Sequence, residues 1–91
     1  MAVTRDEAKL YLRIDNDVED AVIDSLIQSS TTTVENVLRH PLSDYTTLPE
    51  DIKTAILYGV AYLYENRDTA DFDAMIKLMR AMLFSYRDEV F

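Results

Sequence analysis

The segment that decides the fold is "DIKTAILYGVAYLYENRD", from Asp51 to Asp68, which contains the only glycine of the chain. From Ala55 to Tyr64 it has no charged side chain, so almost three helical turns are apolar on nearly every side. A glycine inside a helix costs about 1 kcal/mol relative to alanine. Gly59 therefore indicates either that the segment is not a helix or that another group packs closely against its backbone.

The composition around this segment favours the helical interpretation. The chain has 91 residues, and we expect residues 1–91 to form one small domain. One glycine and two prolines leave few helix breakers, while the absence of cysteine excludes disulfides and thiolate metal sites. We predict an all-α bundle of four to five helices: a short first helix, two long helices, a shorter fourth helix and an irregular C-terminal tail from Phe84 to Phe91.

The first half of the chain contains two predicted helices. The first should begin at Thr4, because "TRDE" has the spacing of a capping box, and should stop near Arg13. Asp15 or Asp17 would cap a second, long helix by accepting hydrogen bonds from its free N–H groups. We expect this helix to continue through the hydroxyl run "SSTTT", because the apolar residues on both sides stay in phase. It should end by His40, which precedes a proline.

The second half contains two more predicted helices. The third should run from about Pro49 to Arg67, because proline suits the first turn of a helix. The fourth should cover roughly Asp71 to Leu83. A methionine stripe on this helix could form an adaptable docking surface, but helical spacing favours a place in the core. The stripe consists of Met75, Met79 and Met82.

A chain of this length has too few other helices to surround the third one, so we infer self-association. Ala55 and Gly59 would permit a close helix crossing, and the tyrosines would place apolar rings with polar tips at the interface. Alternatively, the tyrosines are ordinary core residues. Arg67 would form salt bridges within or between subunits. The candidate interface residues are Ala55, Tyr58, Gly59, Tyr62, Tyr64 and Arg67.

The charge balance restricts the partners. With 17 acidic and 9 basic residues, the net charge is −8, which disfavours free nucleic acid as a ligand for the surface as a whole. The charge could serve solubility alone, or it could form a wall that nucleic acid passes without sticking. The N-terminal "MAVTRDEAK" is not a signal sequence, and no apolar run spans a bilayer. We expect a soluble, intracellular protein with no membrane partner.

The sequence provides little support for catalysis. His40 is the only histidine, and the hydroxyl run has no recognisable base. Glu65 and Asp68 are three residues apart, a spacing at which carboxylates can bind Mg²⁺, but a polar helix end with salt bridges is the simpler interpretation. We predict no catalytic, metal or cofactor-binding residues and no enzymatic activity. A small acidic, antitoxin-like regulatory module and a Mg²⁺-dependent nucleotide hydrolase stay as alternatives.

The order of several short motifs resembles that of the head–tail connector (neck adaptor, or head-completion) family of long-tailed double-stranded DNA phages. The resemblance covers essentially the whole chain. The connection "HPLSDYTTL" is shorter than in many members, where a longer excursion reaches a neighbouring subunit or ring. The matching motifs are Leu12–Asp15, Asp17–Asp20, Leu48–Pro49, Tyr64–Arg67 and Tyr86–Arg87.

The resemblance implies a structural subunit of a homo-oligomeric ring, with twelve copies in the virion. The ring would dock under the portal protein and accept the next neck or tail-completion protein, with Tyr86 and Arg87 as candidate partner-docking residues. Genomic DNA would pass through the lumen without specific binding. The expected location is the virion neck, and the host cytoplasm during assembly.

Overall fold

The computed structural model describes residues 2–86, which form four α-helices and two short 3₁₀ helices and contain no β-strand. This confirms the predicted all-α class. The expected C-terminal tail begins with a 3₁₀ helix, and its residues 87–91 lie outside the described part. The elements are α1 (Arg5–Leu12), α2 (Asp20–Leu38), η1 (Leu42–Asp44), α3 (Glu50–Glu65), α4 (Phe72–Leu83) and η2 (Phe84–Tyr86).

The start of α1 is the predicted capping box. Thr4 Oγ1 accepts a hydrogen bond from the Glu7 N–H at 3.1 Å, and Glu7 Oε1 accepts one from the Thr4 N–H at 3.0 Å. The helix ends before Arg13, which takes a left-handed conformation with φ 62°. Two free N–H groups are thus satisfied at the helix start, as the sequence spacing indicates.

The predicted cap of α2 is wrong. The helix begins at Asp20 behind Glu19, whose side chain makes no capping hydrogen bond. Asp17 instead pairs with Lys9 at 3.2 Å, and Asn16 Oδ1 accepts the Val18 N–H at 3.1 Å in a local turn. The Asp17 carboxylate, which could have capped α2, therefore forms an ion pair with Lys9 of α1 instead. The other expectations for α2 are confirmed: it is continuous through the hydroxyl run and ends at Leu38.

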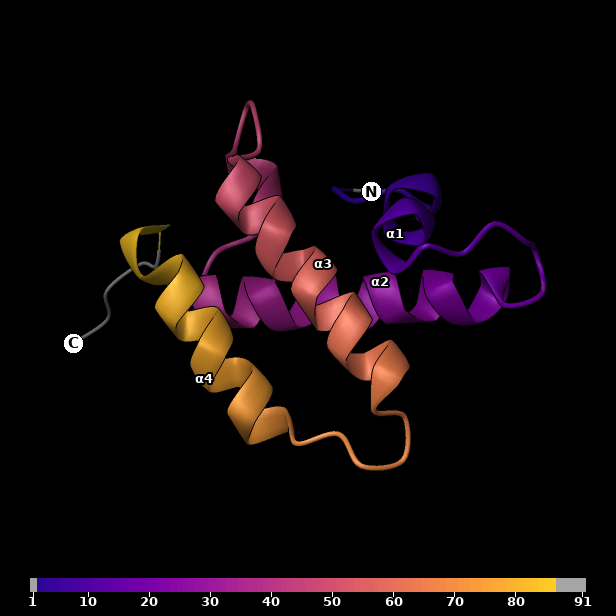
Figure 1. Ribbon diagram of the computed structural model, residues 1–91. Helices are drawn as coiled ribbons and strands as arrows, with labels where there is room; N and C mark the ends of the chain where they lie inside the picture. Colours follow the sequence, from indigo (N-terminus) through magenta and orange to yellow (C-terminus); the bar gives the residue numbers. More distant parts are fainter. Residues whose placement is uncertain (1, 87–91) are drawn as a thin grey trace.

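Helix α3 lies at the centre of the arrangement (Figure 1). It crosses α2, and α1 and α4 lie on opposite sides of it. The chain's own helices bury six residues on one side of α3, so its inner side needs no second copy, whereas the coverage of its outer side by other copies stays a prediction. The buried residues are Ile52, Ala55, Ile56, Gly59, Val60 and Leu63.

The crossing of α2 and α3 explains why residue 59 is a glycine. A Cβ atom there would collide with Ser30 Oγ and lie 2.6 Å from Met79 Cε, so even alanine does not fit without movement. Ser30 is the only buried polar residue among residues 2–86, and its hydroxyl donates to the Ile56 carbonyl at 2.7 Å. The close approach expected at the glycine therefore occurs between helices of one chain.

The methionines of α4 complete this core. Met75 and Met79 are fully buried, and Met82 is partly buried against the same cluster. The core interpretation of the stripe is therefore confirmed, because unbranched side chains fill the irregular space beside the α2–α3 crossing. Within residues 2–86, each helix is too short or too polar to cross a lipid bilayer.

Candidate functional site

Two of the candidate interface tyrosines lie along the side of α3 that faces α4. The rings of Tyr58 and Tyr62 are half-buried, with centroids 6.1 Å apart. The Tyr62 hydroxyl accepts the Asp71 N–H at 2.9 Å, just before α4 begins. Burial, and to a lesser extent the neighbouring Tyr62, raises the pKa of Tyr58. Both rings pack within the chain while part of each stays accessible to a neighbour.

Tyr64 and Arg67 share one carboxylate on the other side of α3. The Tyr64 hydroxyl donates to Glu19 Oε1 at 2.6 Å, and the Arg67 guanidinium donates to Glu19 Oε2 at 2.6 Å while lying 4.5 Å from the centre of the Tyr64 ring. The hydrogen bond from Tyr64, followed by the one from Arg67, lowers the pKa of Glu19. The structure thus supplies Arg67 with an acid from its own chain, and the acid lies 48 residues away in sequence.

Ala55 and Gly59 are buried in the protomer, where Gly59 faces Ser30 and Met79. They lie beneath the surface that a second chain could touch. Their role in a subunit interface, like that of the three tyrosines and Arg67, stays a prediction.

The C-terminal candidate Tyr86 lies at the opposite end of α3 from Arg67. Its hydroxyl donates to Asp51 Oδ2 at 3.0 Å, and this bond raises the pKa of Tyr86. Tyr86 also lines a shallow cavity of about 360 Å³ together with His40 and Tyr45, whose side chains are 2.8 Å apart. Three of its five lining residues have aromatic rings, and a docking role for Tyr86 stays a prediction. The second candidate, Arg87, lies outside the described residues.

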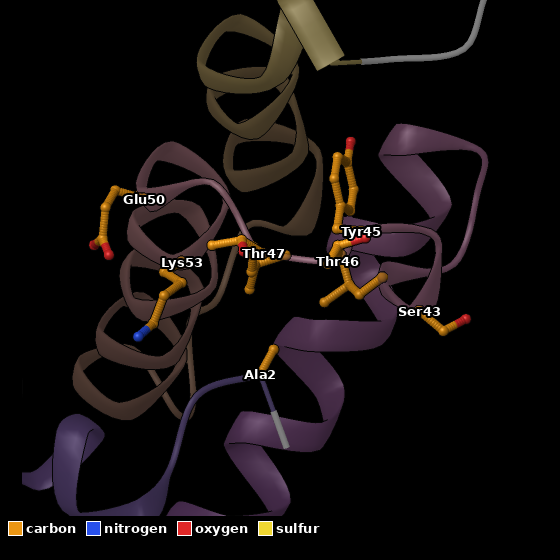
Figure 2. A pocket seen from close by; sticks show the side chains of 9 residues that line it. Ala2, Ser43, Tyr45, Thr46, Thr47, Glu50 and Lys53 are labelled. Atoms are coloured by element: carbon orange, nitrogen blue, oxygen red, sulfur yellow. The ribbon is translucent and has the colours of Figure 1, made fainter.

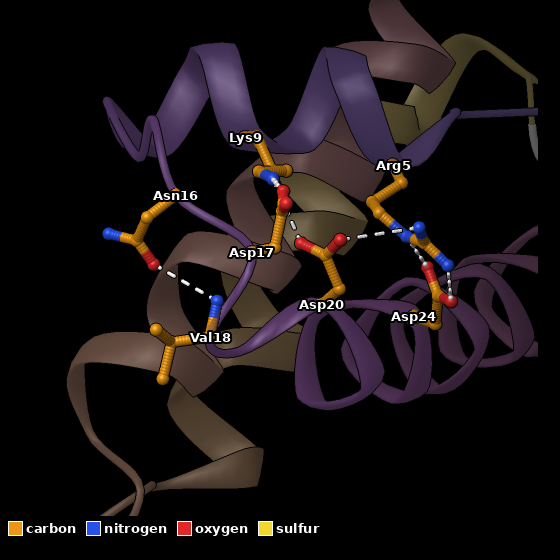
Figure 3. Close-up of polar contacts among 7 residues, drawn as sticks. All are labelled: Arg5, Lys9, Asn16, Asp17, Val18, Asp20 and Asp24. Atoms are coloured by element: carbon orange, nitrogen blue, oxygen red, sulfur yellow. Dashed lines mark hydrogen bonds and ion pairs between the residues drawn. The ribbon is translucent and has the colours of Figure 1, made fainter.

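An ion-pair network that the sequence reasoning missed joins α1 to the start of α2 (Figure 3). Arg5 contacts Asp20 at 3.3 Å and donates to Asp24 at 2.9 Å. Lys9 contacts Asp17 at 3.2 Å and Asp20 at 2.9 Å. The signal was present in the spacing, because two cations four residues apart face acids at spacings of three and four. The network leaves these two cations little capacity for other partners.

The connection between α2 and α3 borders an open pocket of about 490 Å³ that has both polar and apolar lining residues (Figure 2). Its polar lining includes Ser43, Thr46 and Thr47 from the connection and Glu50 and Lys53 from α3. This is the segment that is short relative to the resembled family. It folds against its own chain: the Leu42 N–H, for example, donates to Glu35 Oε2 at 2.8 Å.

The acidic residues considered as metal ligands are not gathered into a centre. Within residues 2–86, no group of three or more His, Asp or Glu side chains is placed to hold a metal ion. Glu65 and Asp68 are exposed at the end of α3 and in the turn that follows it. The described surface consists of helix faces, partly exposed aromatic rings and paired charges. Such features suit contacts with other proteins.

Comparison with known proteins agrees with this character. Residues 3–90 match the family described as phage gp6-like head-tail connector protein, which is nearly the whole chain. No curated protein and no solved structure matched. The chain therefore belongs to the phage gp6-like head–tail connector family, and it is a structural component of the phage neck and thus of the virion.

Proposed function

We propose that this chain is the repeating subunit of a ring between the portal and the tail, through which the phage genome passes. The observation that carries the proposal is the family match across residues 3–90. In this proposal residues 1–91 act as one domain, twelve copies close the ring in the virion, and the protein has no enzymatic activity or cofactor. The ring assembles in the host cytoplasm.

The charge of the chain supports passage of DNA without binding. The net charge is −8, and the ion pairs described above occupy Arg5, Lys9 and Arg67. A lumen lined by the remaining acids would repel phosphate, so that DNA slides and is not held.

The contacts of the ring follow from the accessible side chains. The half-buried rings of Tyr58, Tyr62 and Tyr64 are proposed to contact the neighbouring subunit, since aromatic residues with polar tips suit such surfaces. Ala55 and Gly59 contribute indirectly by letting the helix beneath these rings pack closely. The surface around Tyr86, together with Arg87, is proposed to receive the portal or the next neck protein.

Electron microscopy of the purified chain mixed with its portal protein tests this proposal. We expect a second ring stacked coaxially on the portal. This ring should be missing from particles of the portal alone. The Tyr58→Ser/Tyr62→Ser variant tests the interface: it should reduce ring occupancy if the tyrosines lie between subunits, with circular dichroism as the check that it still folds without the Tyr62–Asp71 hydrogen bond. A chain that stays monomeric with portal at high concentration, and that is missing from purified virions by mass spectrometry, would contradict the proposal.

A further inference from the structure

The outward side of α4 differs in charge from the rest of the chain. After the exposed Asp73 in its first turn, there is no Asp or Glu from residue 74 to residue 86, although acids outnumber bases 17 to 9 overall. Lys77 and Arg80 are exposed and form no ion pair within residues 2–86. Beside them, Leu78 is 46% and Phe84 73% exposed. We name this cationic and apolar region the α4 surface (Lys77, Leu78, Arg80 and Phe84).

A second unusual region lies where α1 leads into α2. Leu10 is 80% and Val18 88% exposed, the two most exposed large apolar side chains among residues 2–86. Asp6, one turn before Leu10 on the same face of α1, and Asp15 are exposed acids. Two exposed cations lie nearby: Arg13 offsets part of this charge, and Arg5 is paired with Asp20 and Asp24. We name this acidic and apolar region the α1–α2 surface (Asp6, Leu10, Asp15 and Val18).

The two surfaces lie on different sides of the protomer. Helices α1 and α4 flank α3 on opposite sides, and the α1–α2 connection extends beyond α2 at the end away from α4 (Figure 1). The molecule measures 44 × 31 × 16 Å along its principal axes. Surfaces so placed cannot meet within one chain. The α4 surface of one copy can meet the α1–α2 surface of a second copy. Each end of such a dimer then still has one free surface to which a further copy can bind.

We propose that the α4 surface of one copy binds the α1–α2 surface of the next copy, head to tail. The apolar side chains of each surface cover those of the other, while Lys77 and Arg80 lie against the acids Asp6 and Asp15. This pairing avoids the repulsion that two chains of charge −8 would otherwise experience. The inference rests on the proposed ring, which a repeated head-to-tail contact generates when its rotation closes.

Charge reversal tests the pairing of the surfaces. Lys77→Glu/Arg80→Glu and Asp6→Lys/Asp15→Lys should each weaken self-association at least about tenfold in sedimentation velocity, because like charges then meet. An equimolar mixture of the two variants should recover it, since every reversed α4 surface then meets a reversed α1–α2 surface. Glu50→Lys, at an exposed acid outside both surfaces, is the control and should associate like the wild type. The midpoint of thermal unfolding should fall by only a few degrees in any variant, because these side chains are exposed and lose at most a favourable interaction with a helix dipole.

Cross-linking tests the geometry, and the cysteine-free chain makes it specific. The Val18→Cys/Leu78→Cys variant treated with a flexible bismaleimide should give a ladder of dimers, trimers and larger species. Each single-cysteine variant should give little dimer, because a head-to-tail contact brings unlike surfaces together. Efficient dimers from either single variant would show a symmetric contact and overturn the inference. So would full self-association of Lys77→Glu/Arg80→Glu accompanied by loss of binding to a double-stranded DNA oligonucleotide.

The outcomes separate this inference from the proposed function. If the charge-reversed variants still form rings on the portal, the named surfaces are wrong while the ring stands. If the wild type gives neither a ladder nor rings, both fail.

Discussion

Close packing stabilises the α2–α3 crossing, whereas ion pairs make up the outer contacts of α1. At the crossing, Gly59 and Ser30 are buried and leave no room for a further carbon atom. Helix α1 packs through the buried Ala8, but its outer contacts are ion pairs, among them Lys53 with Glu7 at 2.7 Å. The crossing therefore depends on shape and should be insensitive to salt. The ionic contacts depend on charge and should weaken with salt and acid.

The largest expected effect is at the crossing. Met79→Ala should lower the free energy of unfolding by about 2–5 kcal/mol, because the fully buried side chain leaves a cavity against Gly59. Urea unfolding at constant protein concentration measures the effect. The neighbouring Leu78→Ala, at a side chain that is 46% exposed, is the control and should change stability by less than about 1 kcal/mol. Equal losses in both variants would contradict the assignment of the core.

An added methyl group should have the next largest effect. Gly59→Ala forces Ser30 and Met79 to move, which costs about 1–3 kcal/mol, while better helix propensity returns about 1 kcal/mol. We expect a net destabilisation of up to about 2 kcal/mol by urea unfolding.

A double-mutant cycle shows whether the hydroxyl is the obstacle. Ser30→Ala removes the oxygen nearest the new methyl group, so the double variant should lose less stability than the sum of the two single variants. Ala61→Gly on the outer side of α3 isolates helix propensity and should cost about 1 kcal/mol. A more stable Gly59→Ala protein would mean that the crossing is looser than described.

The smallest effect is expected for the ion pairs of α1. The hydrogen bonds from Arg5 hold the pKa of Asp24 below its ordinary value of 3.8. A carboxylate with a lowered pKa stabilises the fold above its unfolded pKa, and this contribution is lost as the pH falls through the folded value. Arg5→Ala should therefore destabilise the protein near neutral pH, by less than the core variants, and should flatten the loss of stability below about pH 4.

Salt provides the control for that comparison. At about 1 M NaCl the screening length is about 3 Å, so the difference between wild type and Arg5→Ala should shrink markedly, whereas the Met79→Ala difference should persist. Thermal unfolding at low and high salt measures both. A defect in Arg5→Ala that does not change with salt or pH would point to lost packing of the arginine stem.

Local features were predictable because their causes lie within a few residues. Thr4 and Glu7 cap α1 through contacts three residues apart. The in-phase apolar residues of α2 carry the helix through its hydroxyl run. The sequence also predicted a salt bridge for Arg67, which forms within the chain with Glu19, and its motif order indicated the head–tail connector family.

What only the tertiary structure decided depends on contacts between distant segments. Asp17 pairs with Lys9 and does not cap α2, and Glu19 joins Tyr64 and Arg67 from more than 40 residues away. The apolar pattern alone determined that α3 must be covered, but not by which chain, because hydrophobic burial has no direction. The space at Gly59 settled that question for the inner side of the helix, since only the close fit of Ser30 and Met79 shows which groups fill it.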